Sequence, residues 1–326
     1  MSQRPSSLVF TVMFAVSATV PAGNVSAQAS YPEKPVRLVI GLPPGSSADI
    51  VARLLGQRLA ESLGKPVVVE NAPGASGNIA SERVAKAAPD GHTLAVAGGG
   101  QIIINPSLYK LAFDPMKALV PITQLTESPL VLVVNSAVPA KSTSDLVALA
   151  KVKRGELTFA SGVIGILLTT ELLKSMAGIE IREIPYRKGV VDAIPDLLAG
   201  RITMMFSPVP AVLRLVQDGK LRALGVTSLK RSAALPNVPT IDESGFSGFQ
   251  STSWYGLFAP DRTPATIVSR LHLETVNALA RADVRAKLAD QGFEVIGNSP
   301  DEFAAVIKSE FPKWAKLIKE SGLKAD

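Results

Sequence analysis

Short apolar stretches alternate with longer segments of helical periodicity along most of the chain. Val36–Ile40 is rich in β-branched side chains, and similar stretches cover 67–70, 93–97 and 130–135. Each has the length and composition of a buried strand, and amphipathic segments separate the first three. Strands and helices in this order predict an α/β fold, a mostly parallel sheet with helices on both faces.

The segment after the first strand carries signals for the start and the end of a helix. Ser46 and Asp49 have the spacing of a capping box, in which a hydroxyl and a carboxylate satisfy the first N–H groups of a helix. Apolar residues then recur at helical spacing, Gly64 stands where a C-terminal glycine cap belongs, and Pro66 prevents continuation. The loop 43–47 therefore leads from a buried strand into an amphipathic helix.

The alternation restarts after Asn135. Helix-like and strand-like segments follow one another there, which predicts a second α/β unit over roughly 131–252. One further strand is expected over 253–260, and two helices are expected over 264–288 and 300–321.

The composition is that of a globular protein large enough for two domains. The chain has 326 residues, of which 47% are hydrophobic and 19% are charged. Lys and Arg outnumber Asp and Glu by 34 to 28, a formal charge of +6, but the basic residues are scattered and aromatic residues are few. We interpret the basic residues as solvated surface, and we expect no nucleic-acid partner.

The first 29 residues have the pattern of a secretory signal peptide. A positive charge precedes the apolar run 8–20 and small residues follow it, which predicts cleavage after Ala27 or Ala29. No later segment reaches the roughly 20 apolar residues of a membrane span. The chain has no cysteine, which excludes disulfides, thiolate metal sites, thiol nucleophiles and a cysteine-linked lipid anchor. We therefore expect a soluble protein in the periplasm, where an outer membrane retains an untethered chain.

Two loops of small residues, one in each α/β unit, are the candidate ligand-binding segments. Gly45, Ser46 and Ser47 open a helix in the first unit, and 161–165 opens one in the second. Free N–H groups and the helix dipole favour anions, carboxylates included, at a helix start. Helix capping explains either loop alone, whereas two such loops facing one cleft would make a binding site.

Residues for catalysis or metal binding do not form a recognisable set. Asp49 fits the capping box better than a general base, and His92 and His272 lie outside any H-x-x-x-H pattern. No serine has the G-x-S-x-G spacing, and the glycines at 98–100 lack the third glycine of a dinucleotide loop. We expect no catalytic residue, no metal and no cofactor; Asp49 and Asp196 remain as an acid–base pair only by default.

A set of stretches, taken in order, makes the chain similar to one known family. Each stretch is a weak signal alone, but the ordered set is specific and covers essentially the whole mature chain. It resembles the Bug family, the periplasmic receptors of tripartite tricarboxylate transporters. The stretches are KPVRLVIGLPPGSSADIVAR, VVVENAPGASGNIASERVAKAAPDGHTLAVA, INPSLYKLAFDP, DGKLRALGVTS, LPNVPTIDESG, WYGLFAP and GNSPDEFAAVIKSEFPKWAKLIKESGLK.

The resemblance implies a two-lobed, hinged solute-binding protein of the Venus-flytrap kind. After the signal peptide 1–29, lobe 1 would comprise 30–130 plus 253–326, and lobe 2 would comprise 131–252. Such a protein captures a small organic acid between its lobes and delivers it to separate integral-membrane permease subunits. It is not an enzyme, and we expect a monomer.

The resemblance also implies which residues contact the ligand. In the family, the strand–helix loop of each lobe grips a ligand carboxylate, largely through backbone N–H groups and ordered water, and a Pro-Tyr segment lies beside the cleft. The matching positions are Pro44, Gly45, Ser46, Ser47, Ala48, Asp49, Ser161, Gly162, Gly165, Ile166 and Tyr186.

Both loops depart from the usual pattern of the family. Ser46 replaces a second glycine and Ala48 replaces a threonine in the first loop. The second loop continues through the apolar residues 166–168 where small and hydroxyl residues are usual, and the chain is one residue longer around 187–191.

These departures lead to a prediction about the ligand. Without a hydroxyl at Ile166, a second carboxylate on the ligand would be poorly paired when buried, which is costly. We therefore predict a monocarboxylate, aromatic or branched, in preference to aspartate, glutamate or citrate. Arg187 and Lys188 oppose this preference, since either could reach a second acid group.

Two other functions fit parts of the same pattern. A receptor of this fold can instead serve as the input of a signalling system, which the sequence does not distinguish from transport. An exported α/β enzyme is disfavoured because the chain lacks a nucleophile–base set.

Overall fold

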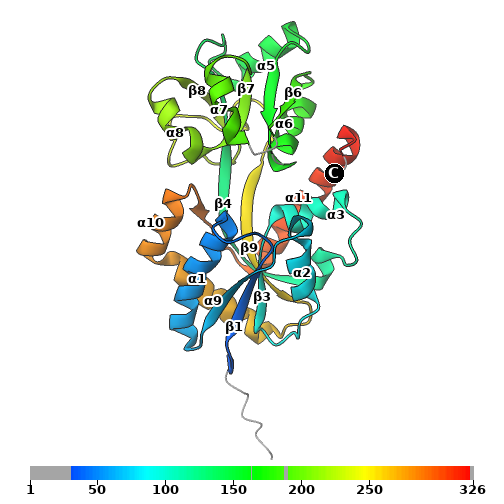
Figure 1. Ribbon diagram of the computed structural model, residues 1–326, viewed down its shortest axis with the longest axis vertical. Helices are drawn as coiled ribbons and strands as arrows, with labels where there is room; N and C mark the ends of the chain where they lie inside the picture. The colour runs from blue at the N-terminus through cyan, green and yellow to red at the C-terminus, as the bar shows by residue number, and fades with distance from the viewer. Residues whose placement is uncertain (1–30, 163, 187–189, 324–326) are drawn as a thin grey trace, which may run out of the picture.

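The computed structural model describes residues 31–162, 164–186 and 190–323 and shows two lobes joined by long strands (Figure 1). The predicted signal peptide, residues 1–29, lies outside the described residues, as do 187–189 of the lengthened segment. β4 (Leu119–Asn135) carries the chain from lobe 1 into lobe 2, and β9 (Thr252–Pro260) begins where the chain returns. None of the described helices is both long and apolar enough to cross a membrane.

The remaining elements divide between the lobes in an α/β pattern. Those of lobe 1 are β1 (Val36–Ile40), α1 (Ser47–Leu63), β2 (Val67–Asn71), η1 (Ala75–Gly77), α2 (Asn78–Ala85), β3 (Thr93–Gly98), η2 (Gly100–Ile104), α3 (Asn105–Leu108), α4 (Pro115–Ala118), α9 (Ala265–Ala280), α10 (Ala282–Asp290), β10 (Glu294–Val295) and α11 (Pro300–Ser321). Those of lobe 2 are α5 (Thr143–Val152), β5 (Thr158–Ser161), α6 (Ile164–Ala177), β6 (Arg182–Pro185), η3 (Val190–Ala193), α7 (Ile194–Leu198), β7 (Met204–Pro208), α8 (Val209–Gln217) and β8 (Leu221–Val226).

One strand, β4, belongs to the sheets of both lobes. The strand order is β2-β1-β3-β9-β4-β7-β5-β6, and β8 and β10 also pair with β4. Up to Pro129, β4 pairs with β9, whereas from Leu130 onward it pairs with β7 and β8. The change of partners at Leu130 marks the passage between the lobes.

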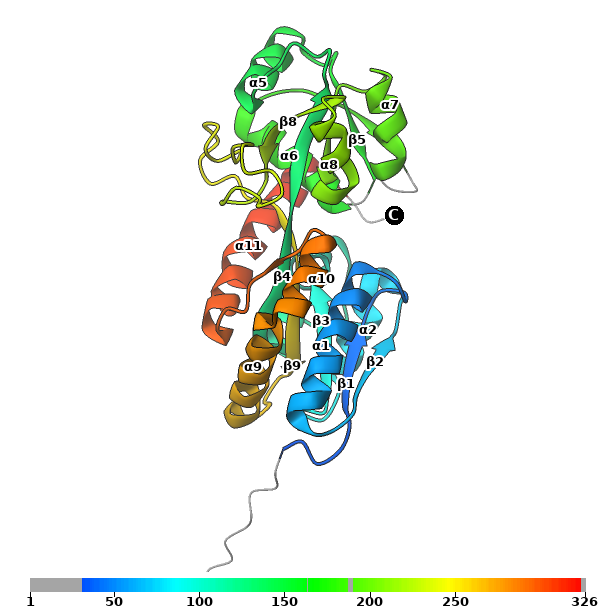
Figure 2. The ribbon, with the colours of Figure 1, turned by 90° about the vertical axis from the view of Figure 1, so that its left-hand side faces the viewer.

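The strand directions turn the carboxyl ends of the parallel strands toward the opposite lobe. β9 is antiparallel to β4, β3 is antiparallel to β9, and β1 is parallel to β3, so β1 and β3 run toward lobe 2. β7 is antiparallel to β4 and β5 is parallel to β7, so β5 runs toward lobe 1. The loops after β1 and β5 therefore lie on the facing sides of the two lobes (Figures 1 and 2).

The first strand and helix form as the sequence predicts. β1 covers Val36–Ile40, and α1 begins directly after its N-cap, Ser46. Gly64 ends α1 in the left-handed conformation, with φ of +66°. Leu55 and Leu59 on the inner face of α1 are completely or almost completely buried in the core of lobe 1, so the apolar stripe read from the sequence holds α1 on the sheet.

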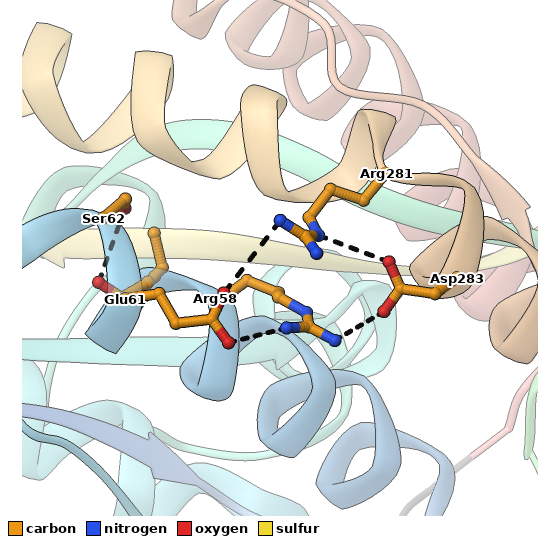
Figure 3. A network of polar contacts seen from close by, with 6 residues as sticks. Arg58, Glu61, Ser62, Arg281 and Asp283 are labelled. Carbon is orange, nitrogen blue, oxygen red and sulfur yellow. Dashed lines mark hydrogen bonds and ion pairs between the residues drawn. The ribbon is translucent and has the colours of Figure 1, made fainter.

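The single helix predicted over 264–288 is wrong. Arg281 adopts extended backbone, with φ of −65° and ψ of +135°, and separates α9 from α10. An ion network surrounds this break (Figure 3): Arg58 of α1 donates to Glu61 at 2.6 Å and to Asp283 at 2.5 Å. Arg281 itself lies 3.3 Å from the Asp283 carboxylate, so the network fastens the break between α9 and α10 to α1.

The C-terminal helix α11 packs along β4 and also contacts α6 of lobe 2. Glu310 on α11 is 6% exposed, and its carboxylate accepts a hydrogen bond from Nε1 of Trp254 on β9 at 3.0 Å. Lys313, one turn later, donates to the carbonyl of Gln250 at 2.8 Å. Both bonds secure the segment in which the chain returns from lobe 2, so α11 braces the connection between the lobes.

We expect the free energy of unfolding of Glu310→Gln to fall less with rising pH than that of the wild type. Burial raises the pKa of Glu310 above its ordinary value of 4.5, so the folded protein retains a proton there that the unfolded chain has released. The free energy of unfolding therefore falls as pH rises from 4.5 through the raised pKa. Glutamine keeps an oxygen for the Trp254 N–H and carries no charge.

Urea unfolding between about pH 4.5 and 8 measures this effect. The matched control is Glu320→Gln, which changes an exposed residue of the same helix and should retain the wild-type pH profile. Identical profiles for Glu310→Gln and the wild type would contradict the assignment.

Candidate functional site

The loop after β1 has the backbone geometry of a helix start that is open to solvent. Pro44, Gly45 and Ser47 are exposed, and Gly45 has φ of +79°, a left-handed conformation that favours glycine. Ser46 is the N-cap of α1, and its hydroxyl accepts a bond from the Asp49 N–H at 3.4 Å. The glycine turn therefore sets the direction in which the first turn of α1 presents its backbone.

Asp49 holds this loop in place. Its side chain is almost completely buried, and one carboxylate oxygen accepts from the Gly45 N–H at 3.0 Å and from Arg53 Nε at 2.9 Å. The other accepts from Asn71 Nδ2 on β2 at 2.9 Å. The Arg53 guanidinium, with the Gly45 and Asn71 donors, lowers the pKa of Asp49 to about 2. The carboxylate reaches Gly45 rather than the N-cap, so Asp49 acts as a latch for the loop.

Two backbone donors remain at the start of α1. The Ser46 N–H donates to Pro43 and the Gly45 N–H to Asp49. Within the part of the chain that the structure describes, the N–H groups of Ser47 and Ala48 have no hydrogen-bond partner. They open a helix of 17 residues on the side of lobe 1 that faces lobe 2, where a helix dipole favours an anion.

Gln101, which follows β3, links the loops beside this site. Its Oε1 accepts from the Gly98 N–H at 2.8 Å, and its Nε2 donates to the Gly77 carbonyl at 3.4 Å. A Cβ on Gly41 would lie 2.6 Å from the Cα of Gly77, and Gly77 itself has φ of +86°, so both positions favour glycine. The glycines after the strands were the available sequence signal for this arrangement.

Tyr255 is a second residue that sequence reasoning did not place at the site. It stands on β9 beside Gly98 of β3. Burial raises the pKa of Tyr255, and the neighbouring Ser47 side chain opposes this rise.

The loop after β5 in lobe 2 begins with a hydroxyl that already donates a hydrogen bond within the protein. Ser161, the last residue of β5, is 5% exposed, and its hydroxyl donates to the carboxylate of Glu183 on β6. Its carbonyl accepts from the Tyr186 N–H at 2.7 Å. Gly162 follows and is partly exposed.

The first turn of α6 directs its apolar residues inward. Ile166 is 5% exposed and belongs to the large core that continues into lobe 2, while Gly165 is partly exposed. The Gly165 carbonyl accepts from the Thr169 hydroxyl at 2.7 Å, and this hydroxyl lies 2.5 Å from that of Ser251, just before β9. The helix that opens with the second loop is thus attached to the segment between the lobes.

The hydroxyl of Tyr186 is engaged within lobe 2. It donates to Asp196, which also pairs with Arg201. Partial burial and the neighbouring Asp196 raise the pKa of Tyr186 to about 12. Arg201 and Tyr186 hold the pKa of Asp196 below its ordinary value, so Asp196 is an ion-pair partner.

No group of three His, Cys, Asp or Glu side chains that could bind a metal occurs among residues 31–162, 164–186 and 190–323. His92 is buried at the start of β3, with Nδ1 3.3 Å from Asp90. Nε2 of His272 lies 3.1 Å from the Asn298 carbonyl. The start of α1 therefore offers backbone donors that an anion could accept.

Comparison with known sequences gives one family. The model for the tripartite tricarboxylate transporter family receptor matches residues 51–323. Protein BugT of Bordetella pertussis is 36% identical over 307 residues, covering 93% of this chain and 94% of BugT. A protein encoded in the tcbD-tcbE intergenic region of Pseudomonas sp. strain P51 is 37% identical over 300 residues, covering 91% of this chain and 89% of the relative.

Comparison with solved structures gives the same fold. A Rhodopseudomonas palustris protein, MatC with bound malate, is 32% identical with a TM-score of 0.68, and the match covers 88% of this chain and 100% of MatC. An R. palustris protein with adipate is 33% identical with a TM-score of 0.71, over 90% of this chain and 99% of its own. A solute-binding protein from Polaromonas without ligand is 25% identical with a TM-score of 0.81, over 89% and 99%.

We expect Asp49→Asn to destabilise the protein by about 1–3 kcal/mol at neutral pH, because the amide has one acceptor oxygen for three donors and no charge for Arg53. The pKa of Asp49 is lowered from 3.8 to about 2, so its contribution is present above pH 3.8 and is lost as pH falls toward 2.

Urea unfolding should therefore show a difference between wild type and Asp49→Asn at about pH 7 that shrinks below about pH 4. Asp145 stands at the corresponding position of α5 in lobe 2, so Asp145→Asn tests whether any capping acid behaves in the same way. Because Asp145 is exposed, the loss of stability in this variant should be smaller. An equal loss in both variants would contradict a special role for Asp49.

Proposed function

This chain belongs to the tripartite tricarboxylate transporter receptor family, and we propose that it captures a small organic carboxylate between its lobes for a separate membrane permease. Its family and structural neighbours are periplasmic solute-binding proteins rather than enzymes. The observation that carries the proposal is the pair of helix-opening loops on facing sides of the lobes. In the first, the N–H groups of Ser47 and Ala48 have no partner among the described residues.

The ligand carboxylate would bind first at the start of α1. Two N–H groups and the positive end of the helix dipole attract an anion, and the Asp49 latch fixes their direction before binding. The start of α6 would complete the clamp from lobe 2. The structures of relatives with adipate and malate support a carboxylate as the ligand class.

Ligand capture would require the lobes to move. The TM-score is 0.81 with the ligand-free Polaromonas protein but 0.71 and 0.68 with the adipate and malate complexes, although these two are more similar in sequence. This difference supports an open arrangement here and a closed one with ligand. The permease would then recognise the closed form, whose population the ligand raises through its differential affinity.

The boundaries and location of the mature protein follow from the same proposal. We assign residues 1–29 to a cleaved signal peptide, 30–130 plus 253–326 to lobe 1, and 131–252 to lobe 2. The change of β4 partners at Leu130 and the start of β9 at Thr252 support these boundaries. We place the mature protein in the periplasm as a monomer.

We propose a monocarboxylate rather than a dicarboxylate as the ligand. The hydroxyls of Ser161 and Tyr186 already donate to Glu183 and Asp196, and Ile166 brings no donor. A second carboxylate buried at lobe 2 would therefore receive no hydrogen bond from these three side chains, which leaves its charge less well compensated.

Thermal unfolding with a panel of acids tests this preference. Benzoate and isovalerate should raise the midpoint more than malate and citrate at equal concentration, because a ligand that binds the folded state stabilises it by mass action. A larger rise with malate or citrate would overturn the monocarboxylate preference and keep the receptor. No rise with any of these acids would contradict the carboxylate proposal.

Ser47→Pro tests the backbone clamp. Ser47 is the first helical residue, where proline is best tolerated, and Ser46 has φ of −69° and ψ of +162°, which suits a residue before proline. The change removes the Ser47 N–H and should weaken binding of the best acid of the panel at least about tenfold, the effect of one charge-assisted hydrogen bond.

The matched control is Ser47→Ala, which removes the hydroxyl but keeps the N–H. Calorimetric titration of both variants separates the two groups. If Ser47→Pro binds as tightly as Ser47→Ala, the first turn of α1 does not hold the carboxylate.

A further inference from the structure

Glu183 occupies an unexpected place for a receptor of anions. In the register of β5 and β6, Glu183 lies opposite Phe159, and Pro185 lies opposite Ser161. The Glu183 carboxylate nevertheless accepts from the Ser161 hydroxyl, so its side chain leans toward the carboxyl end of the strands. That end points toward lobe 1 and carries the second loop.

Glu183 also differs from its neighbouring acids in lobe 2. Glu180 pairs with Arg154 at 2.6 Å, Glu171 pairs with Lys174 at 2.6 Å, and Asp196 pairs with Arg201. Among the ion pairs within residues 31–162, 164–186 and 190–323, none involves Glu183. Glu183 is exposed, and the Ser161 hydroxyl supplies one hydrogen bond without neutralising its charge.

A carboxylate at this position affects the two ends of a ligand differently. The carboxylate held at Ser47 and Ala48 lies in the other lobe, where backbone N–H groups receive it. A second carboxylate at the Ser161 loop would meet the like charge of Glu183 and a hydroxyl that donates elsewhere. An ammonium group there would instead gain a charge-assisted hydrogen bond to Glu183.

We propose that Glu183 is a specificity-determining residue that selects amino acids with a carboxylate at one end and an ammonium at the other, and rejects dicarboxylates. The inference rests on the proposed function, because it takes the carboxylate clamp of lobe 1 as the other half of the site. It narrows the monocarboxylate class to zwitterions.

Three acids with the same chain of four methylenes test the inference. Hexanoate ends in a methyl group, 5-aminopentanoate in an ammonium and adipate in a second carboxylate. Calorimetric titration of the mature protein should give at least about tenfold tighter binding of 5-aminopentanoate than of adipate. In Glu183→Gln this ratio should fall at least about tenfold, since the amide neither attracts the ammonium nor repels the carboxylate.

Two further variants separate charge from structure. Ser161→Ala removes the bond between Ser161 and Glu183 but keeps the charge, and it should retain the preference for the amine. Glu180→Gln removes an exposed acid just before β6 and should leave all three affinities unchanged. Unfolding midpoints without ligand verify that Glu183→Gln is folded.

The outcomes distinguish this inference from the function on which it rests. Tighter binding of adipate than of 5-aminopentanoate, or an unchanged ratio in Glu183→Gln, overturns the role of Glu183 while the carboxylate receptor stands. Loss of the preference in Ser161→Ala to the same degree as in Glu183→Gln assigns the effect to loop structure and also overturns it. Binding of none of the three acids contradicts the carboxylate function and this inference together.

Discussion

The arrangement of the molecule depends on one constraint, the sharing of β4 between two sheets. Because β4 pairs with β9 before Pro129 and with β7 and β8 after it, one strand sets the direction of both sheets. The antiparallel partners on either side then force the parallel strands of each lobe to end toward the other lobe. The helix-opening loops after β1 and β5 thus lie on facing sides of the two lobes, as the proposed two-sided clamp requires.

Local patterns predicted the parts of the fold that depend on local physics. Val36–Ile40 and the cap at Gly64 follow from hydrophobic periodicity and from the conformational freedom of glycine. The first half of β4 was missed because Pro121 and Pro129 interrupt its apolar pattern, and β4 accommodates Pro121 at a register shift. The break at Arg281 was missed because Glu61 and Arg58, which complete the ion network around it, come from α1, far away in the sequence.

In the candidate site, too, the local sequence predicted the loops but not their contacts with distant elements. The loops at 44–49 and 161–166 were predicted from small residues that precede a helix. Which of their groups are engaged could not be predicted, since Asn71, Glu183 and Asp196 reach the site from other elements. Whether a hydroxyl is already hydrogen-bonded within the protein matters more here than the type of residue that carries it. A hydroxyl that already donates its proton cannot donate it to a ligand.

The two lobes therefore contribute differently to recognition. In lobe 1, the Asp49 latch fixes the backbone so that Ser47 and Ala48 present N–H groups that any carboxylate can accept. This preorganisation lowers the entropy lost on binding but discriminates little between acids. In lobe 2, the hydroxyls of Ser161 and Tyr186 already donate to Glu183 and Asp196, and Asp196 is paired with Arg201, so Glu183 is the carboxylate whose charge a ligand would meet. In the proposed clamp, affinity for the shared carboxylate would arise in lobe 1, and discrimination would arise from the charge that lobe 2 presents.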